Sequence, residues 1–384
     1  MKKLLFLLLI FAFVLGCGTE PNPTIVEHID ISKFEFPESR TFNMGFTPWP
    51  YEFTDTASNE TYSLITEHSD FVVHHLDGGV PWSEAFANEP YNQHVLDEIA
   101  KRKSKSSKTN KVYLAVTFLS MMRNSVAGYW GLEENMALPE YWKNKEFDDS
   151  ELIEAYLNYC RFMIAEFEPD YFAYGIELDA ELREEDPEFD KMIYFISKIY
   201  PVLKKEYPDL PIFVTIVDES PNDNFEIKKN SAKRILDYSD YLALSSYPFW
   251  NISGKWGTTS DPKEIPSDWY SKIKTLAPEK PFAIAETGYI AETLSLPKYG
   301  LNIEGNEEWQ AEYIHWFFQE MNKNDAEFVA WFTIRDYDQG WEFLNLMGFD
   351  EFFKTWKDTG LIDGGGNPRK SLAVWDKWLE LKKE

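Results

Sequence analysis

Apolar and β-branched residues gather into eight short runs, each bounded by turn residues. Several runs are continuously apolar, which is typical of strands in a parallel sheet covered by helices on both faces. The runs occupy positions 41–49, 70–76, 112–119, 171–178, 212–217, 241–247, 282–285 and 328–334. Stretches with apolar residues at helical spacing lie between or after them, at 92–103, 151–167, 187–206, 226–238, 268–276, 307–322 and 372–381. This alternation predicts an α/β fold, a single-domain (β/α)₈ barrel. A doubly wound open sheet is the alternative, although no glycine-rich phosphate motif follows the first strand.

The N-terminus is predicted to be a targeting segment. Two lysines precede an apolar run at 4–15, which is too short to span a membrane and has the length of a signal-peptide core. The run leads into Val-Leu-Gly-Cys at 14–17, which resembles the lipobox of bacterial lipoproteins. The resemblance implies cleavage before Cys17 and a lipid on that cysteine, which anchors the protein at the cell envelope or cell surface. A plain secretory signal with a coincidental cysteine is the alternative. We therefore expect a signal peptide at 1–16, a lipidated N-terminus and tether at 17–36, and the catalytic barrel at 37–384.

Composition and charge narrow the range of partners. The 384 residues are 44% hydrophobic and 17% aromatic, enough for a large core and for rings that stack on flat ligands such as sugars. The formal net charge is −27 at pH 7, which disfavours a polyanion as partner. The longest basic run, 101–105, lies at the end of a predicted helix and is interpreted as a solvated face. We expect no nucleic-acid partner.

Two glutamates stand where predicted strands end. Glu286 follows the apolar run 281–285, and Glu177 follows a similar run at 171–176. A buried, unpaired carboxylate is costly, so such a residue usually has a dedicated partner or lies at the rim of a pocket. Hydrolysis of a glycosidic bond needs one carboxylic acid to protonate the leaving oxygen and one carboxylate to attack the sugar carbon or activate water. Because parallel strands of a barrel end on one face, we predict that the two glutamates form a catalytic pair there. A salt bridge with a barrel arginine is the alternative for each.

These motifs resemble clan A of the glycoside hydrolases, whose barrels carry the acid/base glutamate after strand four and the nucleophile after strand seven. Ala-Ile-Ala-Glu-Thr-Gly at 283–288 looks like the clan's nucleophile strand. Leu-Ser-Ser-Tyr-Pro-Phe-Trp at 244–250 is similar to strand six of the endo-β-1,4-galactanase family, and Ala-Trp-Phe at 330–332 corresponds to the strand-eight tryptophan. The likeness covers most of 41–381 and favours an endo-acting enzyme.

The resemblance assigns roles to individual residues. It implies that Glu177 is the acid/base residue, that Glu286 is the nucleophile, that Tyr247 lies near Glu286 and that Trp331 forms the floor of the cleavage subsite. One position departs from the pattern: the clan usually has asparagine before the acid/base glutamate, where it bonds a sugar hydroxyl, and here Ile176 stands there. An isoleucine cannot make that bond, so we expect Asp179 or Asn124 to supply it, or a substrate without the usual hydroxyl arrangement.

Further polar and aromatic residues near the ends of predicted strands are expected to bind substrate. The predicted substrate-binding set is Trp49, His75, Asp77, Trp82, Asp179, Tyr247, Trp250 and Trp331. The cluster His74-His75-x-Asp77 also suggests a metal site. Adjacent residues of a strand point to opposite faces, however, so both histidines cannot readily hold one ion, and we expect no metal and no cofactor.

The leading hypothesis is a lipid-anchored, retaining glycoside hydrolase that acts on an extracellular polysaccharide or oligosaccharide. The alternative is a catalytically inactive glycan-binding surface lipoprotein on the same barrel, which the isoleucine at 176 favours and the retained glutamate pair opposes. A metal-dependent barrel hydrolase is a third reading and rests on the His74–Asp77 cluster alone. The residues leave open the sugar, the linkage, endo or exo action, the membrane leaflet and the oligomeric state.

Overall fold

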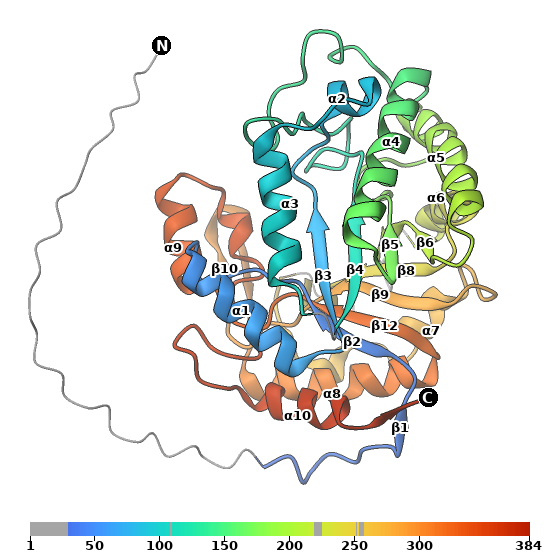
Figure 1. The fold of residues 1–384 in the computed structure, drawn as a ribbon. Helices are drawn as coiled ribbons and strands as arrows, with labels where there is room; N and C mark the ends of the chain where they lie inside the picture. Colours follow the sequence, from blue (N-terminus) through green and yellow to red (C-terminus); the bar gives the residue numbers. More distant parts are fainter. Residues whose placement is uncertain (1–29, 108–109, 219–224, 251, 253–256) are drawn as a thin grey trace, which may run out of the picture.

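The structure, a computed structural model, describes residues 30–107, 110–218, 225–250, 252 and 257–384. Its centre is a parallel barrel surrounded by helices (Figure 1). The strands pair in the order β6-β5-β4-β3-β2-β12-β9-β8-β7, and β6 and β7 are separated by a single residue, Val214. The two ends of the sheet are therefore two halves of one strand, and the barrel closes through them. The predicted (β/α)₈ fold is confirmed.

All eight predicted strands are present, the fifth being split into β6 and β7. The strands are β1 (Ser39–Arg40), β2 (Asn43–Phe46), β3 (Phe71–Leu76), β4 (Lys111–Val116), β5 (Tyr171–Ala173), β6 (Ile212–Phe213), β7 (Thr215–Val217), β8 (Leu242–Ser246), β9 (Phe282–Thr287), β10 (Leu294–Leu296), β11 (Leu301–Ile303), β12 (Ala326–Trp331) and β13 (Lys382–Lys383). Outside the barrel, β10 and β11 form an antiparallel hairpin, and β1 pairs with β13 beside the C-terminus.

Helices cover the outside of the barrel. They are α1 (Asp55–His68), α2 (Trp82–Ala87), α3 (Gln93–Lys105), α4 (Ser150–Phe167), α5 (Pro187–Glu206), α6 (Phe225–Leu236), α7 (Trp269–Lys274), α8 (Glu307–Lys323), α9 (Asp338–Leu346) and α10 (Lys370–Leu379), with the short 3₁₀ turns η1 (Pro248–Trp250) and η5 (Glu351–Lys354) in loops. Polar side chains begin several of them: Asn92, Asp186 and Asn306 each accept a hydrogen bond from a first-turn backbone N–H of α3, α5 and α8. None of the helices within the described ranges is both long and apolar enough to cross a membrane.

Strand side chains alternate between two cores. One core fills the barrel and contains Phe71 and Val73 of β3, Ala283 and Ala285 of β9, and Phe328 and Ala330 of β12, together with Ile176. The other lies between the strands and the helices and contains the intervening residues, such as Val72, Ile284 and Val329. This period of two decides which side chains can reach the mouth of the barrel. Cys17 and the predicted signal peptide lie outside the described residues.

Candidate active site

Glu286 reaches the mouth of the barrel because of a bulge in β9. Leu244 pairs with Ile284, but the next residue of β8, Ser245, pairs with Glu286, so Ala285 is an extra residue on β9. The register between β9 and β12 shifts over the same segment. A bulge of this kind re-aims the side chain that follows it. Glu286 thus leaves the alternation that would place it in the outer core, and 18% of its side chain stays accessible.

Glu177 stands in the loop after β5 in a left-handed backbone conformation, with φ of 54°. Such a conformation costs a non-glycine residue about 1–3 kcal/mol and persists only where the surroundings hold it. Here the backbone N–H of Glu177 donates to the Thr215 hydroxyl of β7 at 2.8 Å. The side chain is 22% accessible. The preceding residue, Ile176, is buried in the barrel core and offers no polar group.

Both glutamates are anchored to the same end of β8. The Ser245 hydroxyl donates to Glu177 Oε1 at 2.6 Å, and the Tyr247 hydroxyl donates to Glu286 Oε1 at 2.7 Å. Ser245 is in β8 and Tyr247 follows directly after it, while His75 and Arg123 also connect the two glutamates through Asp77. The structure therefore brings the two carboxylates together in one region at the end of the barrel.

Two cations and a third acid link the glutamates into one chain of ion pairs. His75 Nδ1 lies 3.2 Å from Glu286 Oε2, and its Nε2 lies 3.7 Å from Asp77 Oδ2. Arg123 Nη2 lies 3.4 Å from that same Asp77 oxygen, and Arg123 Nε donates to Glu177 Oε2 at 3.1 Å. The order is thus Glu177, Arg123, Asp77, His75 and Glu286, with charges that alternate when the histidine is protonated. An arginine partner for Glu177 was the alternative reading of that residue, and it is present, within a network that also includes Glu286.

The network sets the protonation of its members. Burial lowers the pKa of His75, but the ion pairs with Asp77 and Glu286 outweigh burial and raise it to about 10. Burial raises the pKa of Glu286, yet the bonds from His75 and Tyr247 and the charge of Arg123 bring it below its ordinary value. At neutral pH His75 is therefore a cation and Glu286 a carboxylate. His74 points to the opposite face, where complete burial lowers its pKa to about 3, so the two histidines do not share a site.

An aromatic wall stands beside the carboxylates. Phe332 follows β12, and its ring lies 5.8 Å from that of Trp49 and 6.2 Å from that of Trp356. The Trp356 ring in turn lies 6.1 Å from that of Tyr247. All four residues are partly accessible, and the indole N–H groups of Trp49 and Trp356 have no hydrogen-bond partner among the described residues. Such rings match the apolar faces of sugars, whereas the two indole nitrogens themselves are buried.

Trp331 lies elsewhere, which corrects the expectation drawn from the clan resemblance. Phe328 and Ala330 point into the barrel, so Trp331 points outward. Its ring is fully buried near Tyr313 and Trp375, and its N–H donates to the Thr359 carbonyl at 2.9 Å. Phe332 is the aromatic residue that strand alternation brings to the mouth.

Trp82 and Asp179 are also buried and offer no surface to a ligand. The Trp82 ring packs 6.0 Å from Trp142, and its N–H donates to the Ala127 carbonyl. Asp179 is 1% exposed and accepts a bond from the Val217 backbone N–H at 2.8 Å, so it fastens a loop and does not replace the missing asparagine. Trp250 is partly accessible and stacks on Phe352 of η5, at 6.0 Å.

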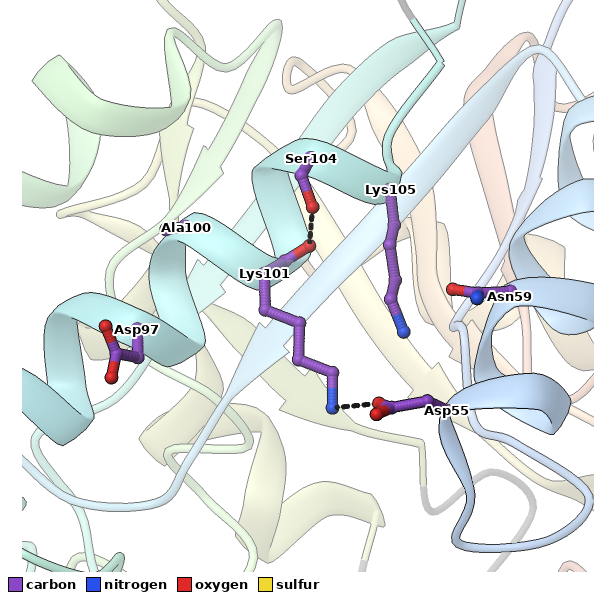
Figure 2. Close-up of a pocket in the computed structure, with 7 residues that line it drawn as sticks. All are labelled: Asp55, Asn59, Asp97, Ala100, Lys101, Ser104 and Lys105. Carbon is purple, nitrogen blue, oxygen red and sulfur yellow. Dashed lines mark hydrogen bonds and ion pairs between the residues drawn. The ribbon is translucent and has the colours of Figure 1, made fainter.

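A separate hollow of about 640 Å³ lies between α1 and α3 (Figure 2). Its polar groups are paired with one another or with close neighbours: Lys101 bonds Asp55 at 3.0 Å, and Lys105 donates to Ser58 at 2.7 Å. None of the residues predicted from the sequence to act on substrate lines this hollow, and it lies between helices on the outside of the barrel.

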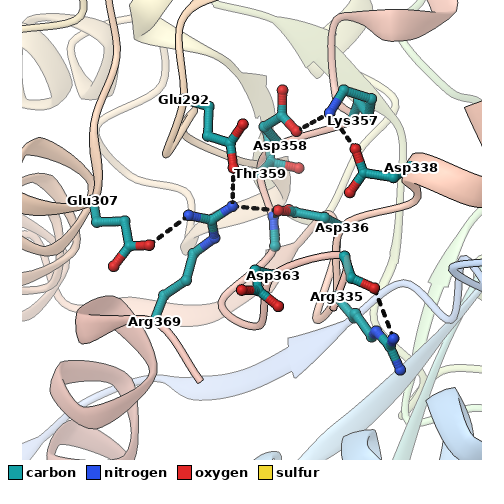
Figure 3. A network of polar contacts seen from close by, with 12 residues as sticks. Glu292, Glu307, Arg335, Asp336, Asp338, Lys357, Asp358, Thr359, Asp363 and Arg369 are labelled. Carbon is teal, nitrogen blue, oxygen red and sulfur yellow. Dashed lines mark hydrogen bonds and ion pairs between the residues drawn. The ribbon is translucent and has the colours of Figure 1, made fainter. Parts of the chain in front are cut away.

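A second charged network joins loops near the end of the barrel (Figure 3). Glu292, Asp336 and Asp358 bring carboxylate oxygens within 4.8 Å of one another. Arg369 bonds Asp336 at 2.5 Å and Glu292 at 2.8 Å, and Lys357 bonds Asp358. Two cations thus already neutralise much of the negative charge of these acids. The ion pairs connect the loops to the segment before α10.

Comparison with known proteins supports the fold. No family model matches the chain, and no curated protein matches it. Solved structures with the same barrel include an exo-β-1,4-mannosidase from Opitutaceae bacterium strain TAV5, with 14% identity and a TM-score of 0.61 over 91% of this chain. The match spans 61% of the length of that mannosidase.

Two further solved structures share the fold. A GH5_18 protein from Streptomyces cattleya, solved in complex with GlcNAc, has 13% identity and a TM-score of 0.60, over 89% of this chain and 80% of that one. The GH53 catalytic domain from Ignisphaera aggregans has 16% identity and a TM-score of 0.55, over 94% of this chain and all of that domain. At these identities the likeness shows a shared (β/α)₈ barrel, of the kind seen in glycoside hydrolases.

Proposed function

We propose that the protein is a retaining glycoside hydrolase that cleaves glycosidic bonds of an extracellular polysaccharide or oligosaccharide. The observation that supports this best is the convergence of Glu177 and Glu286, which accept hydrogen bonds from Ser245 of β8 and from Tyr247 directly after it, beside an aromatic wall. The solved structures with the same barrel include an exo-β-1,4-mannosidase, a xylanase and a GH53 catalytic domain, which makes β-linked sugars the first class to test.

In this proposal Glu286 is the nucleophile. His75 and Tyr247 keep it ionised and fix both of its oxygens, so that it can attack the anomeric carbon. Glu177 gives a proton to the leaving oxygen and, in the second step, takes one from the attacking water. Asp77 holds the two cations between the glutamates, and Trp49, Phe332 and Trp356 bind the sugar rings.

A substrate panel combined with single substitutions tests the proposal. Purified protein is incubated with galactan, mannan and xylan and with aryl β-glycosides of the corresponding sugars, and release of reducing sugar or of the aryl group is measured. Glu177→Gln is expected to lower kcat on polysaccharide roughly 10²–10⁴-fold, and Glu286→Gln at least as much. Glu206→Gln serves as the control, because Glu206 is an accessible glutamate at the end of α5 and is not part of the site. Full activity of both site variants would rule out the mechanism.

Azide rescue assigns the two roles separately. In Glu286→Ala a small anion can occupy the place of the missing carboxylate, so azide should yield a glycosyl azide of inverted anomeric configuration. In Glu177→Ala azide should instead attack the glycosyl-enzyme and give a product of retained configuration. NMR of the products distinguishes the two, and an exchanged pattern would show that the roles are reversed.

The second candidate is a glycan-binding protein that no longer cleaves. The observation that favours it is that both oxygens of Glu177 already accept bonds from the protein, one from Arg123 and one from Ser245. It predicts that calorimetry detects oligosaccharide binding while product analysis of the same mixture detects no cleavage. Phe332→Ala should weaken that binding as well.

We also propose that Cys17 carries a lipid and anchors the protein to a membrane of the cell envelope. The support is the sequence Val-Leu-Gly-Cys after an apolar run of signal-peptide length. Cys17→Ser should move the protein from the membrane fraction to the soluble fraction and abolish incorporation of labelled palmitate. Unchanged fractionation would contradict the proposal.

A further inference from the structure

The ion pair between Arg123 and Glu177 joins two strained residues. Arg123 belongs to the long loop after β4 and, like Glu177, is a non-glycine residue in the left-handed region, with φ of 56° and 54° respectively. Arg123 is 8% exposed. Strain of this kind is kept where surrounding contacts over-determine the backbone, and it concentrates at functional sites. Arg123 and Glu177 are two such residues, and their side chains are bonded to each other. This indicates that the strained backbone serves to maintain the contact between the two side chains.

The two oxygens of Glu177 are not equivalent. Oε2 accepts from Arg123 Nε at 3.1 Å, and Oε1 accepts from the Ser245 hydroxyl at 2.6 Å. A guanidinium can only donate hydrogen bonds, and a protonated oxygen is a weaker acceptor than a carboxylate oxygen, so the contact with Arg123 disfavours a proton on Oε2. A serine hydroxyl can donate or accept and rotates freely between the two. A proton on Glu177 is therefore favoured on Oε1, with the Ser245 hydroxyl turned to accept.

We propose that Arg123 is a positioning residue for Glu177. It reserves Oε2, so that Oε1 carries the proton that reaches the leaving group, and it stabilises the carboxylate that remains after the transfer. Asp77 accepts a hydrogen bond from Arg123 Nη2 at 3.4 Å, and the backbone carbonyl of Ser120 accepts one from Nη1 at 3.4 Å. These two contacts fix the plane of the guanidinium. The inference rests on the proposed function, because it assigns Arg123 a part in the acid step of that reaction.

The step balances as follows. The proton moves from Oε1 of Glu177 to the glycosidic oxygen, and the bond between that oxygen and the anomeric carbon breaks with its electron pair going to the oxygen. A carboxylate oxygen of Glu286 forms a bond to the anomeric carbon. Water then attacks that carbon, its proton returns to Glu177, and Glu286 leaves as a carboxylate. Arg123 stays a cation throughout and exchanges no proton.

The dependence of rate on the leaving group tests this role. A 2,4-dinitrophenyl leaving group departs without protonation, whereas a phenyl leaving group needs the acid. Arg123→Met should lower kcat/KM for the phenyl β-glycoside roughly 10–100-fold, the loss of a hydrogen bond to a charged group, and leave the dinitrophenyl β-glycoside within about threefold. Arg123→Lys keeps the positive charge but not the planar set of guanidinium donors. It should therefore recover part of the loss in kcat/KM. Arg161→Met, which removes an accessible arginine from its pair with Glu206, is the control.

Glu177→Gln is measured on the same pair of substrates, the phenyl and the dinitrophenyl glycoside of β-mannose or β-xylose. The comparison distinguishes a failure of the inference about Arg123 from a failure of the proposed function. A strong leaving-group dependence in Glu177→Gln that Arg123→Met does not share would overturn the inference and keep the proposed function. The absence of that dependence in Glu177→Gln would overturn the role of Glu177 and with it the inference. Equal losses on both leaving groups in Arg123→Met would show that the arginine only maintains the loop, which also overturns the proposal.

Discussion

Removal of Arg369 is expected to destabilise the barrel by about 3–5 kcal/mol, because it leaves a buried carboxylate without its cation. Asp336 is 0% exposed, and one of its oxygens bonds Arg369 at 2.5 Å while the other accepts from the Gly360 N–H at 2.7 Å. Arg369 itself is 3% exposed and also bonds Glu292 and Glu307 (Figure 3). In Arg369→Met the charge on Asp336 would face only a backbone dipole, so the cost exceeds that of an ordinary surface pair.

The destabilisation should grow with pH. Burial already raises the pKa of Asp336 well above its usual range, and the charge of Arg369 opposes that rise. The folded wild-type protein therefore already binds a proton on Asp336 over a pH range in which the unfolded chain has released it, and removal of the arginine extends that range to higher pH. The additional loss of stability in Arg369→Met therefore develops as pH rises from the folded pKa of Asp336 with the arginine to the still higher folded pKa without it.

Urea unfolding followed by circular dichroism at pH 5 and pH 7.5 measures both effects. Arg161→Met is the matched control, since Arg161 and Glu206 are each 37% exposed and such a pair contributes at most about 1 kcal/mol. Adding Asp336→Asn to Arg369→Met should recover part of the loss and remove its pH dependence. An Arg369→Met protein as stable as the Arg161→Met control at both pH values would refute the reasoning.

Two further predictions concern the site. His75→Gln should move the acid limb of kcat/KM to higher pH, because burial, which raises the pKa of Glu286, is then opposed by Tyr247 and Arg123 alone; an unmoved limb in the pH profile would contradict this. Phe332→Ala should raise KM for oligosaccharides. Trp331→Phe should lower the free energy of unfolding by about 1 kcal/mol and leave KM unchanged. If kinetics instead showed a raised KM in Trp331→Phe and an unchanged KM in Phe332→Ala, Trp331 would be a substrate-binding residue.

The strands could be predicted because each lies in a short run of apolar and β-branched residues bounded by turn residues, but some helices have a weaker sequence pattern. The helix α1 was missed, since its buried positions are Ala57, Thr61, Tyr62 and Ile65, and two of these are small or polar. The sequence pattern there lacks a clear apolar stripe, and the barrel supplies the apolar surface on which the helix rests. The helix α9 was also missed, because only Gly340 and Leu344 are buried in it and its apolar residues face outward.

The candidate site shows the same limit in finer detail. The apolar runs before Glu177 and Glu286 pointed to both residues, and the resemblance to clan A suggested their roles. The bulge that turns Glu286 to the mouth has no signature in the apolar run itself. The distinction between Trp331 and Phe332 was within reach, since alternation from Phe328 decides it. Arg123 was not, because it lies in a long irregular loop and only the closed barrel brings it against a residue 54 positions further along the chain.

The alternating order of charges suits a reaction in which a negative charge changes place. With Glu177 protonated, the chain of Arg123, Asp77, His75 and Glu286 carries two positive and two negative charges. In the proposed reaction Glu286 becomes a neutral ester in the first step and Glu177 becomes the carboxylate, so the net charge of the network is again zero while the negative charge has moved from the His75 end to the Arg123 end. Each end already holds a fixed cation at 3.1–3.2 Å from its glutamate, so the site need not rearrange to accept the charge. This arrangement of charges supports the proposed double displacement, in which the two acids exchange ionisation states, over the binding of a sugar without cleavage.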